Sequence, residues 1–109
     1  MKEIKAFIHR SRVADVVRAI EKAGYRNLSL VDLKGMLKAV DDKEQEYSGE
    51  IGEKVITEVK LELVCEDDKR TAEAAWIIQE KADTGHPEAG WIYVSEILKA
   101  LPIGRRRDA

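Results

Sequence analysis

The apolar positions of this chain repeat every second residue in some stretches and every third or fourth residue in others. In residues 2–9, Ile4, Ala6 and Ile8 share one face, which predicts a first strand. Residues 55–65 alternate with the same period of two and predict a third strand. Residues 27–34 and 91–95 predict the second and fourth strands.

Two helices are predicted between these strands. The first has Ser11 as its N-cap, Gly24 just past its end, and a buried stripe made of Val13, Val16, Val17 and Ile20. The second spans about residues 69–83 and is capped by Asp67 or Asp68. Its thin apolar face consists of Ala72, Ala75, Ile78 and Ala82. A further helical turn is predicted for residues 96–101, and residues 104–109 are expected to be frayed.

This order of elements predicts an α+β fold, a ferredoxin-like βαββαβ sandwich with an antiparallel sheet and both helices on one face. The 109 residues have the length of one domain, 1–109. In the second strand Ser29, Val31 and Leu33 alternate with Leu28 and Leu30, so the strand is apolar on both faces. An apolar outer sheet face predicts a homo-oligomer.

A long polar segment, residues 37–53, separates the second and third strands. Loops of more than about 12–15 residues are usually functional or disordered. Residues 41–46 have too little apolar side chain to fold onto a core. We therefore expect this segment to project, to move and to contact other proteins.

Composition and charge exclude several classes of protein. Charged residues make up 37% of the chain and apolar runs are short, so we expect no membrane-embedded segment, and no signal peptide is recognisable. The single cysteine, Cys65, is expected to be buried in a protein of the reducing cytoplasm. A net charge of −2 gives no reason to bind nucleic acid, and residues 105–107, all arginine, are expected to form a solvated tail. No metal-ligand spacing, catalytic triad or carboxylate pair is found, which predicts neither a metal site nor an enzyme.

Four stretches of the chain resemble the PII family of signal-transduction proteins. They are residues 1–9, residues 33–36, residues 59–64, and Thr84-Gly85 followed by Gly90-Trp-Ile-Tyr-Val94. The resemblance covers almost the whole chain, and residues 37–53 have the right length for that family's T-loop. It implies a cytoplasmic homotrimer whose inter-subunit clefts bind an adenine nucleotide (ADP, AMP or ATP) as an allosteric effector, with no cofactor. It also implies that the T-loop docks on a membrane transporter, a metabolic enzyme or a regulator.

The resemblance also assigns site residues. The nucleotide-binding positions that it implies are Ser29, Gly35, Met36, Leu37, Lys38, Glu62, Val64, Gly85, His86, Pro87, Gly90 and Arg105. Residues 84–90 are similar to the family's B-loop, whose backbone N–H groups wrap the phosphates. The T-loop positions expected to contact a partner are Asp42, Glu46, Tyr47, Gly49 and Ile51.

Several departures from the family pattern lie around the phosphates. His86 and Trp91 stand where the family has lysines, and Glu58 replaces a lysine near the oxoglutarate site. Ala39 replaces the glutamine that helps to hold magnesium and oxoglutarate, and Ile51 replaces a tyrosine that some relatives modify. Because the missing positive charge surrounded the terminal phosphates, we expect ADP or AMP to bind better than ATP with magnesium. His86 is also a candidate donor to a phosphate or a bicarbonate-like anion.

Other ferredoxin-like proteins are alternatives to this interpretation. A CutA-type or other ferredoxin-like trimer would have a metal-related or small-molecule binding role. A small hydrolase of phosphate-type substrates needs a positioned arginine and a water-orienting amide, and no such pair is found. An RNA-recognition module needs exposed aromatic residues on its central strands, and the predicted third strand has none.

Overall fold

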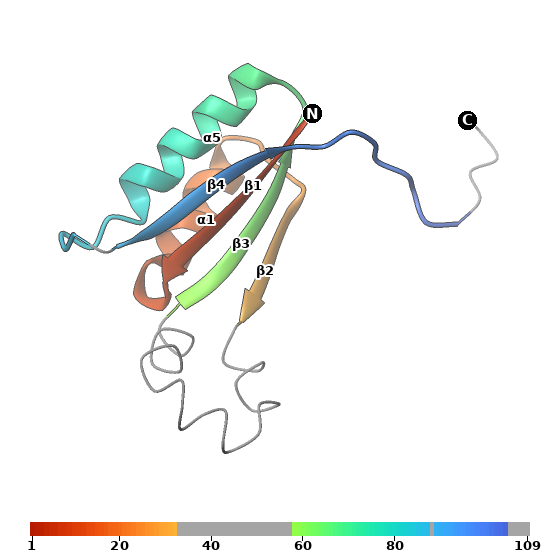
Figure 1. Cartoon of the computed structure of the whole chain (residues 1–109). Helices are drawn as coiled ribbons and strands as arrows, with labels where there is room; N and C mark the ends of the chain where they lie inside the picture. The colour runs from red at the N-terminus through yellow and green to blue at the C-terminus, as the bar shows by residue number, and fades with distance from the viewer. Residues whose placement is uncertain (33–57, 88, 105–109) are drawn as a thin grey trace, which may run out of the picture.

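The structure is a computed structural model that describes residues 1–32, 58–87 and 89–104 (Figure 1). Its elements are β1 (Lys2–His9), the 3-10 helix η1 (Arg10–Arg12), α1 (Val13–Lys22), β2 (Leu28–Asp32), β3 (Glu58–Cys65), α5 (Asp68–Lys81) and β4 (Gly90–Glu96). The described residues therefore confirm the α+β class, with four strands and two α-helices in the predicted order. The predicted nucleotide-binding positions Gly35, Met36, Leu37, Lys38 and Arg105 lie outside the described residues. So do Ala39 and the predicted partner-binding positions Asp42, Glu46, Tyr47, Gly49 and Ile51.

The four described strands form one antiparallel sheet in the order β2-β3-β1-β4. The central strand β1 pairs with β3 from Lys2↔Cys65 to His9↔Glu58, and with β4 on its other side. Both helices cover the same face of the sheet (Figure 1), as predicted for a ferredoxin-like arrangement. Each helix in the described part of the chain is too short or too polar to cross a bilayer.

The core lies between this face of the sheet and the two helices. Alternation along β1 and β3 turns every second side chain inward, and each large side chain buried there contributes about 1.5–3 kcal/mol. Its fully buried members are Ile4, Ala6, Val16, Ile20, Leu61, Leu63, Ala74 and Ile78. The predicted inward row of β1 and the central part of the α1 stripe are thereby confirmed.

The inward face of α5 is rotated from the predicted one. Thr71, Ala74 and Ile78 are buried, whereas Ala72 is exposed. Asp67 is the N-cap, its Oδ1 accepting a hydrogen bond from the Arg70 N–H at 2.8 Å. The Thr71 hydroxyl donates to the Asp67 carbonyl at 2.7 Å, so this polar side chain is satisfied while it faces the core. The predicted Ile78 and Ala82 are confirmed in the core and Ala75 packs against it, so only Ala72 was wrong, because a run of alanines does not mark one face strongly.

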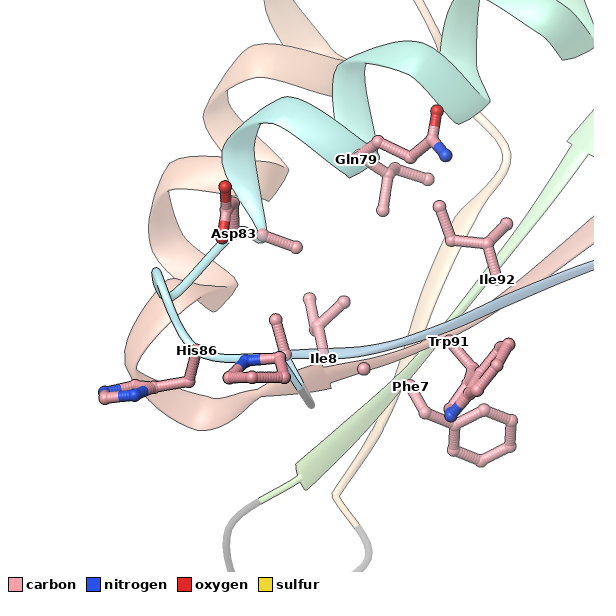
Figure 2. A pocket seen from close by; sticks show the side chains of 12 residues that line it. Phe7, Ile8, Gln79, Asp83, His86, Trp91 and Ile92 are labelled. Atoms are coloured by element: carbon pink, nitrogen blue, oxygen red, sulfur yellow. The ribbon is translucent and has the colours of Figure 1, made fainter.

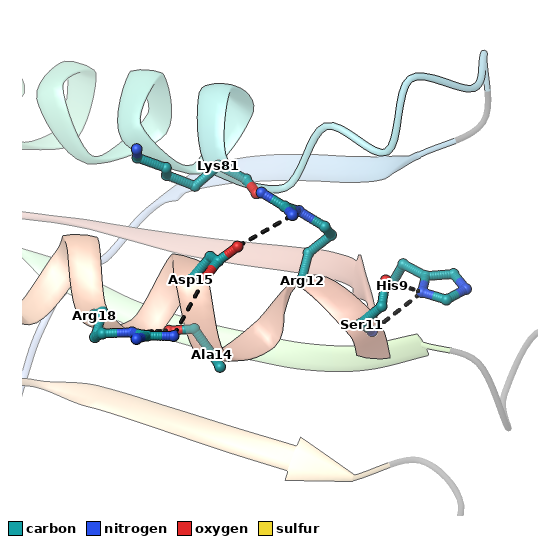
Figure 3. A network of polar contacts seen from close by, with 7 residues as sticks. All are labelled: His9, Ser11, Arg12, Ala14, Asp15, Arg18 and Lys81. Carbon is teal, nitrogen blue, oxygen red and sulfur yellow. Dashed lines mark hydrogen bonds and ion pairs between the residues drawn. The ribbon is translucent and has the colours of Figure 1, made fainter.

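The start of α1 also differs from the prediction. Ser11 is not the N-cap of the α-helix, because it lies within η1, the tight turn that follows β1 directly. The Ser11 N–H donates to Nδ1 of His9 at 3.1 Å (Figure 3), so the histidine side chain caps the turn. The predicted end of α1 is confirmed, since Gly24 follows the C-cap Ala23 with a φ of 92°.

The predicted helical turn in residues 96–101 is absent from the structure. After β4 the chain runs away from the sheet without helix (Figure 1), and Leu98 and Ile103 are 95% and 104% exposed. One turn before Pro102 forms too few hydrogen bonds to be stable by itself. The apolar side chains of this C-terminal arm, residues 97–104, are left without cover in a single copy of the chain.

Cys65 provides a first prediction, on the reactivity of the core. Cys65 is 2% exposed, and desolvation by burial raises the pKa of its thiol, which favours the protonated form in the fold. The stability that this gives is present below the pKa of an unfolded thiol and is lost as the pH rises through the raised value. We expect a disulfide reagent such as DTNB to leave the native protein unmodified at pH 8 and to react fully in guanidinium. Fast reaction of the native protein would contradict the placement of Cys65.

Candidate functional site

The turn between α5 and β4 is held by short-range hydrogen bonds from its own side chains. The Gly85 N–H donates to Asp83 Oδ1 at 2.8 Å, and the His86 N–H donates to Thr84 Oγ1 at 3.3 Å. Gly85 has a φ of 82°, a left-handed conformation that glycine adopts without strain. Gly85 is not the helix C-cap, because α5 ends at Lys81 with Ala82 as its cap. The sequence Asp-Thr-Gly therefore builds a defined turn in front of the β4 strand.

Gly90 joins this turn to the sheet. It pairs with Ile8 and has a φ of 143°, and a Cβ placed on it would lie 2.1 Å from the carbonyl oxygen of Phe7. No side chain fits at that distance, so β4 approaches β1 closely only because residue 90 is glycine. The glycine predicted as part of a ligand loop thus has a structural role in the fold.

A cavity of about 520 Å³ lies between the last turn of α5, the turn that follows it, the end of β1 and the start of β4 (Figure 2). Three isoleucines form its apolar floor, Ile8, Ile78 and Ile92, and Gln79 and Asp83 provide polar groups at its rim. Three residues predicted for the site also line it: His86, Pro87 and Gly90. The His86 ring is exposed and points away from the cavity in Figure 2.

A second group of predicted residues lies on the outer face of the sheet, opposite the helices. Ser29 is directly across from Glu62 in the β2–β3 pair, and Val64 is on the same face two residues further along. Lys60 Nζ lies 3.0 Å from Glu62 Oε1, so the glutamate already has a cationic neighbour. Sequence reasoning missed Lys60, although its spacing of two from Glu62 on a strand was a usable signal.

The two groups of residues are separated by the central strand. Glu62 is opposite Lys5, whereas Gly90 is opposite Ile8, three positions further along β1. Three residues span roughly 10 Å along a strand, and the two strand spacings from β3 across β1 to β4 add roughly 10 Å at right angles to it. Glu62 and Gly90 are therefore about 14 Å apart. The cavity at the turn is also lined by α5 and by the core-facing Ile8 and Ile92, whereas Glu62 is on the outer face, so the two groups do not form one continuous site within a copy.

An aromatic cluster occupies the β1–β4 half of the outer face. The rings of Phe7 and Tyr93 meet edge to face with centroids 6.0 Å apart, and Trp91 pairs with Phe7 across the strands. Tyr93 and Trp91 are 56% and 65% exposed, which is unusual for large aromatic side chains that lie next to one another. The sequence predicted the apolar outer surface on the second and third strands, whereas the exposed aromatic side chains lie on β1 and β4.

A bidentate ion pair fixes the end of β2, where the chain enters residues 33–57. The two terminal nitrogens of Arg10 donate to the Asp32 carboxylate at 2.7 and 3.0 Å. Hydrogen bonding to Asp32 raises the pKa of Arg10. Nothing in the local pattern predicted this pair, because the two residues are 22 positions apart.

In the residues that the structure describes, no three His, Cys, Asp or Glu side chains come together as metal ligands. The described chain is thus a ferredoxin-like α+β protein with two candidate binding regions: a glycine-containing turn at the start of β4 and the outer face of β2 and β3. The sequence matches the family model "Nitrogen regulatory protein P-II" over residues 1–107. The chain belongs to this P-II family, which consists of regulatory signalling proteins.

Individual relatives agree with this assignment. The chain is 31% identical over 105 residues to "Nitrogen regulatory protein P-II 1" of Methanothermobacter thermautotrophicus, covering 94% of this chain and 89% of the relative. It is 30% identical over 105 residues to "Nitrogen regulatory protein P-II" of Bradyrhizobium diazoefficiens and 27% identical over 103 residues to that of Porphyra purpurea. Each of these two comparisons covers 94% of this chain and 91% of the relative.

Proposed function

We propose that this protein is a non-catalytic, cytoplasmic P-II regulator that binds an adenine nucleotide between the subunits of a homotrimer. The bound nucleotide sets the position of the T-loop, residues 37–53, which contacts a transporter, a metabolic enzyme or a regulator. The family match over residues 1–107 is the observation on which this proposal rests. The same match favours a P-II regulator over the CutA-type alternative.

Trimer formation is supported by two apolar surfaces that a single copy leaves exposed. One is the aromatic cluster of Phe7, Trp91 and Tyr93 on the outer face of the sheet. The other is the C-terminal arm, in which Leu98, Leu101 and Ile103 are exposed. Burial of both against neighbouring copies would remove these side chains from water.

The different chemistry of the two groups of residues supports a ligand with unlike ends, such as a nucleotide. We place the adenine ring near Ser29, Glu62 and Val64 on the outer face and the phosphates near the turn that contains Gly85, His86 and Pro87. Because these groups are about 14 Å apart in the sheet of one copy, a nucleotide bound between subunits would take them from neighbouring copies. A ligand can shift the equilibrium between two T-loop conformations only if it binds one conformation more tightly than the other.

The charges around the turn support a preference for fewer phosphates. His86 stands in the turn and Trp91 is the second residue of β4, at positions where the family resemblance implies lysines. The Asp83 carboxylate lies in the same turn and would repel a terminal phosphate. We therefore propose that ADP or AMP binds in preference to ATP with magnesium.

This preference gives a second prediction. By calorimetry at fixed ionic strength, we expect ADP to bind about tenfold more tightly than Mg-ATP, because one charged hydrogen bond contributes about 1.5–3 kcal/mol. His86→Lys is expected to remove most of this difference by restoring one cation. Ala72→Lys adds the same charge at an exposed position of α5 outside the turn and is expected to change nothing. Tight binding of Mg-ATP that oxoglutarate strengthens would refute the proposed preference, and no nucleotide binding would refute the function.

A further inference from the structure

A groove runs between α1 and α5 on the helical side of the protein, away from the nucleotide site. It encloses about 910 Å³. Its floor is apolar and is formed by Ala19, Ala23 and Ile77. Because two of these residues are alanines, the helices leave a channel between their outer surfaces into which another side chain can fit.

Trp76 forms one wall of this groove and is 62% exposed. An indole ring held in water next to apolar groups loses the stabilisation that burial would give it. Tryptophan is also enriched at the positions that contribute most to protein–protein binding. Trp76 therefore has the properties of a residue that anchors a binding partner, and it contributes little to the core.

The rim of the groove is positively charged. Four cationic side chains and two carboxylates line it, which leaves a net charge of +2 on a chain whose net charge is −2. The cations are Arg12, Arg18, Lys22 and Lys81, and the carboxylates are Asp15 and Glu80. This local reversal of sign selects an acidic occupant over a basic one.

One of the two carboxylates is already neutralised within the rim (Figure 3). Asp15 pairs with Arg12 at 3.1 Å and with Arg18 at 3.3 Å. Arg12 also donates from Nε to the carbonyl of Lys81 at 2.8 Å, which ties the start of α1 to the end of α5. The groove is therefore held in shape by its own contacts, and Lys22 and Lys81 are exposed among its lining residues.

We propose that the α1–α5 groove is a docking site for an acidic segment of a partner protein. An apolar side chain of that segment packs against Trp76 and the Ala19 floor, and its carboxylates pair with Lys22 and Lys81. The groove lies on the opposite side of the sheet from the aromatic cluster, so trimer formation through that cluster leaves it accessible. This contact is additional to any made by the T-loop.

The probe for this site is a short fluorescein-labelled peptide of glutamates around a central Leu-Phe pair, followed by fluorescence anisotropy. We expect the wild-type protein to bind it. The double variant Lys22→Glu/Lys81→Glu and the single variant Trp76→Ala are each expected to weaken binding by about tenfold or more, as loss of an interface anchor does. Lys69→Glu reverses a single charge on α5 outside the groove, half of the charge change in the double variant, and is expected to have no effect. All four positions are exposed, so none of these changes disturbs the core.

Three results would overturn the proposal. The first is that the glutamate peptide does not bind, and the second is that Lys69→Glu weakens binding as much as the groove variants do. The third is that a matched lysine peptide, a uridine oligonucleotide or phosphatidylglycerol vesicles bind more strongly through Trp76. The last result would assign the groove to a different class of partner.

Discussion

Replacing Gly90 by alanine is expected to lower the free energy of unfolding by about 3 kcal/mol or more, the upper end for single backbone strains. The added Cβ would overlap the Phe7 carbonyl oxygen at 2.1 Å, and the φ of 143° is one that alanine rarely adopts. Relief requires β4 to move away from β1, which breaks the pairing that begins at Gly90↔Ile8. Chemical denaturation at one fixed protein concentration measures this loss, since assembly makes stability depend on concentration.

Gly85→Ala is the matched control for this variant. Gly85 also has a positive φ, of 82°, but a Cβ placed on it meets nothing within 4 Å. Its replacement should therefore cost only about 1–2 kcal/mol, the ordinary penalty for a left-handed alanine. Equal losses for the two variants would mean that the backbone conformation matters and the contact with Phe7 does not.

Tyr93→Lys is expected to dissociate the proposed homotrimer into monomers. The change removes the edge-to-face contact with Phe7 and places a second cation opposite Lys5 on the outer face. Burial of an unpaired ammonium group at an interface costs several kcal/mol per copy, so association should weaken by more than about a hundredfold. Size-exclusion chromatography with light scattering measures the mass directly.

Trp76→Lys is the control for dissociation. Trp76 is as exposed in one copy as Tyr93, at 62% against 56%, but it lies on the helical side. This variant should remain trimeric. A wild-type protein that is monomeric at micromolar concentration, or a Tyr93→Lys variant that stays assembled, would contradict the proposed interface.

The elements of this fold were predictable because their signals are local. Alternation over a few residues placed β1 and β3 and turned Leu61, Leu63 and Cys65 inward, and the structure confirms these positions. The predictions failed where local signals were weak or in competition. Ser11 is a good N-cap by type, but the chain turned directly out of β1 into η1 and His9 took the capping role.

The candidate site was predictable only in part. The resemblance pointed to the turn at residues 84–90, and the structure places His86, Pro87 and Gly90 together there. It did not indicate that Gly90 is required by a neighbouring carbonyl, or that Lys60 pairs with Glu62. It also missed the Arg10–Asp32 pair at the end of β2.

Periodicity and motifs were thus enough for the class of fold, the family and the inward rows of the strands, because each depends on residues close in the chain or on a pattern shared with relatives. The approach of Gly90 to Phe7, the joining of Arg12 to the end of α5 and the charged groove around Trp76 depend on distances between segments far apart in the chain. Such distances arise only when helices and strands pack, so the tertiary structure alone decided them.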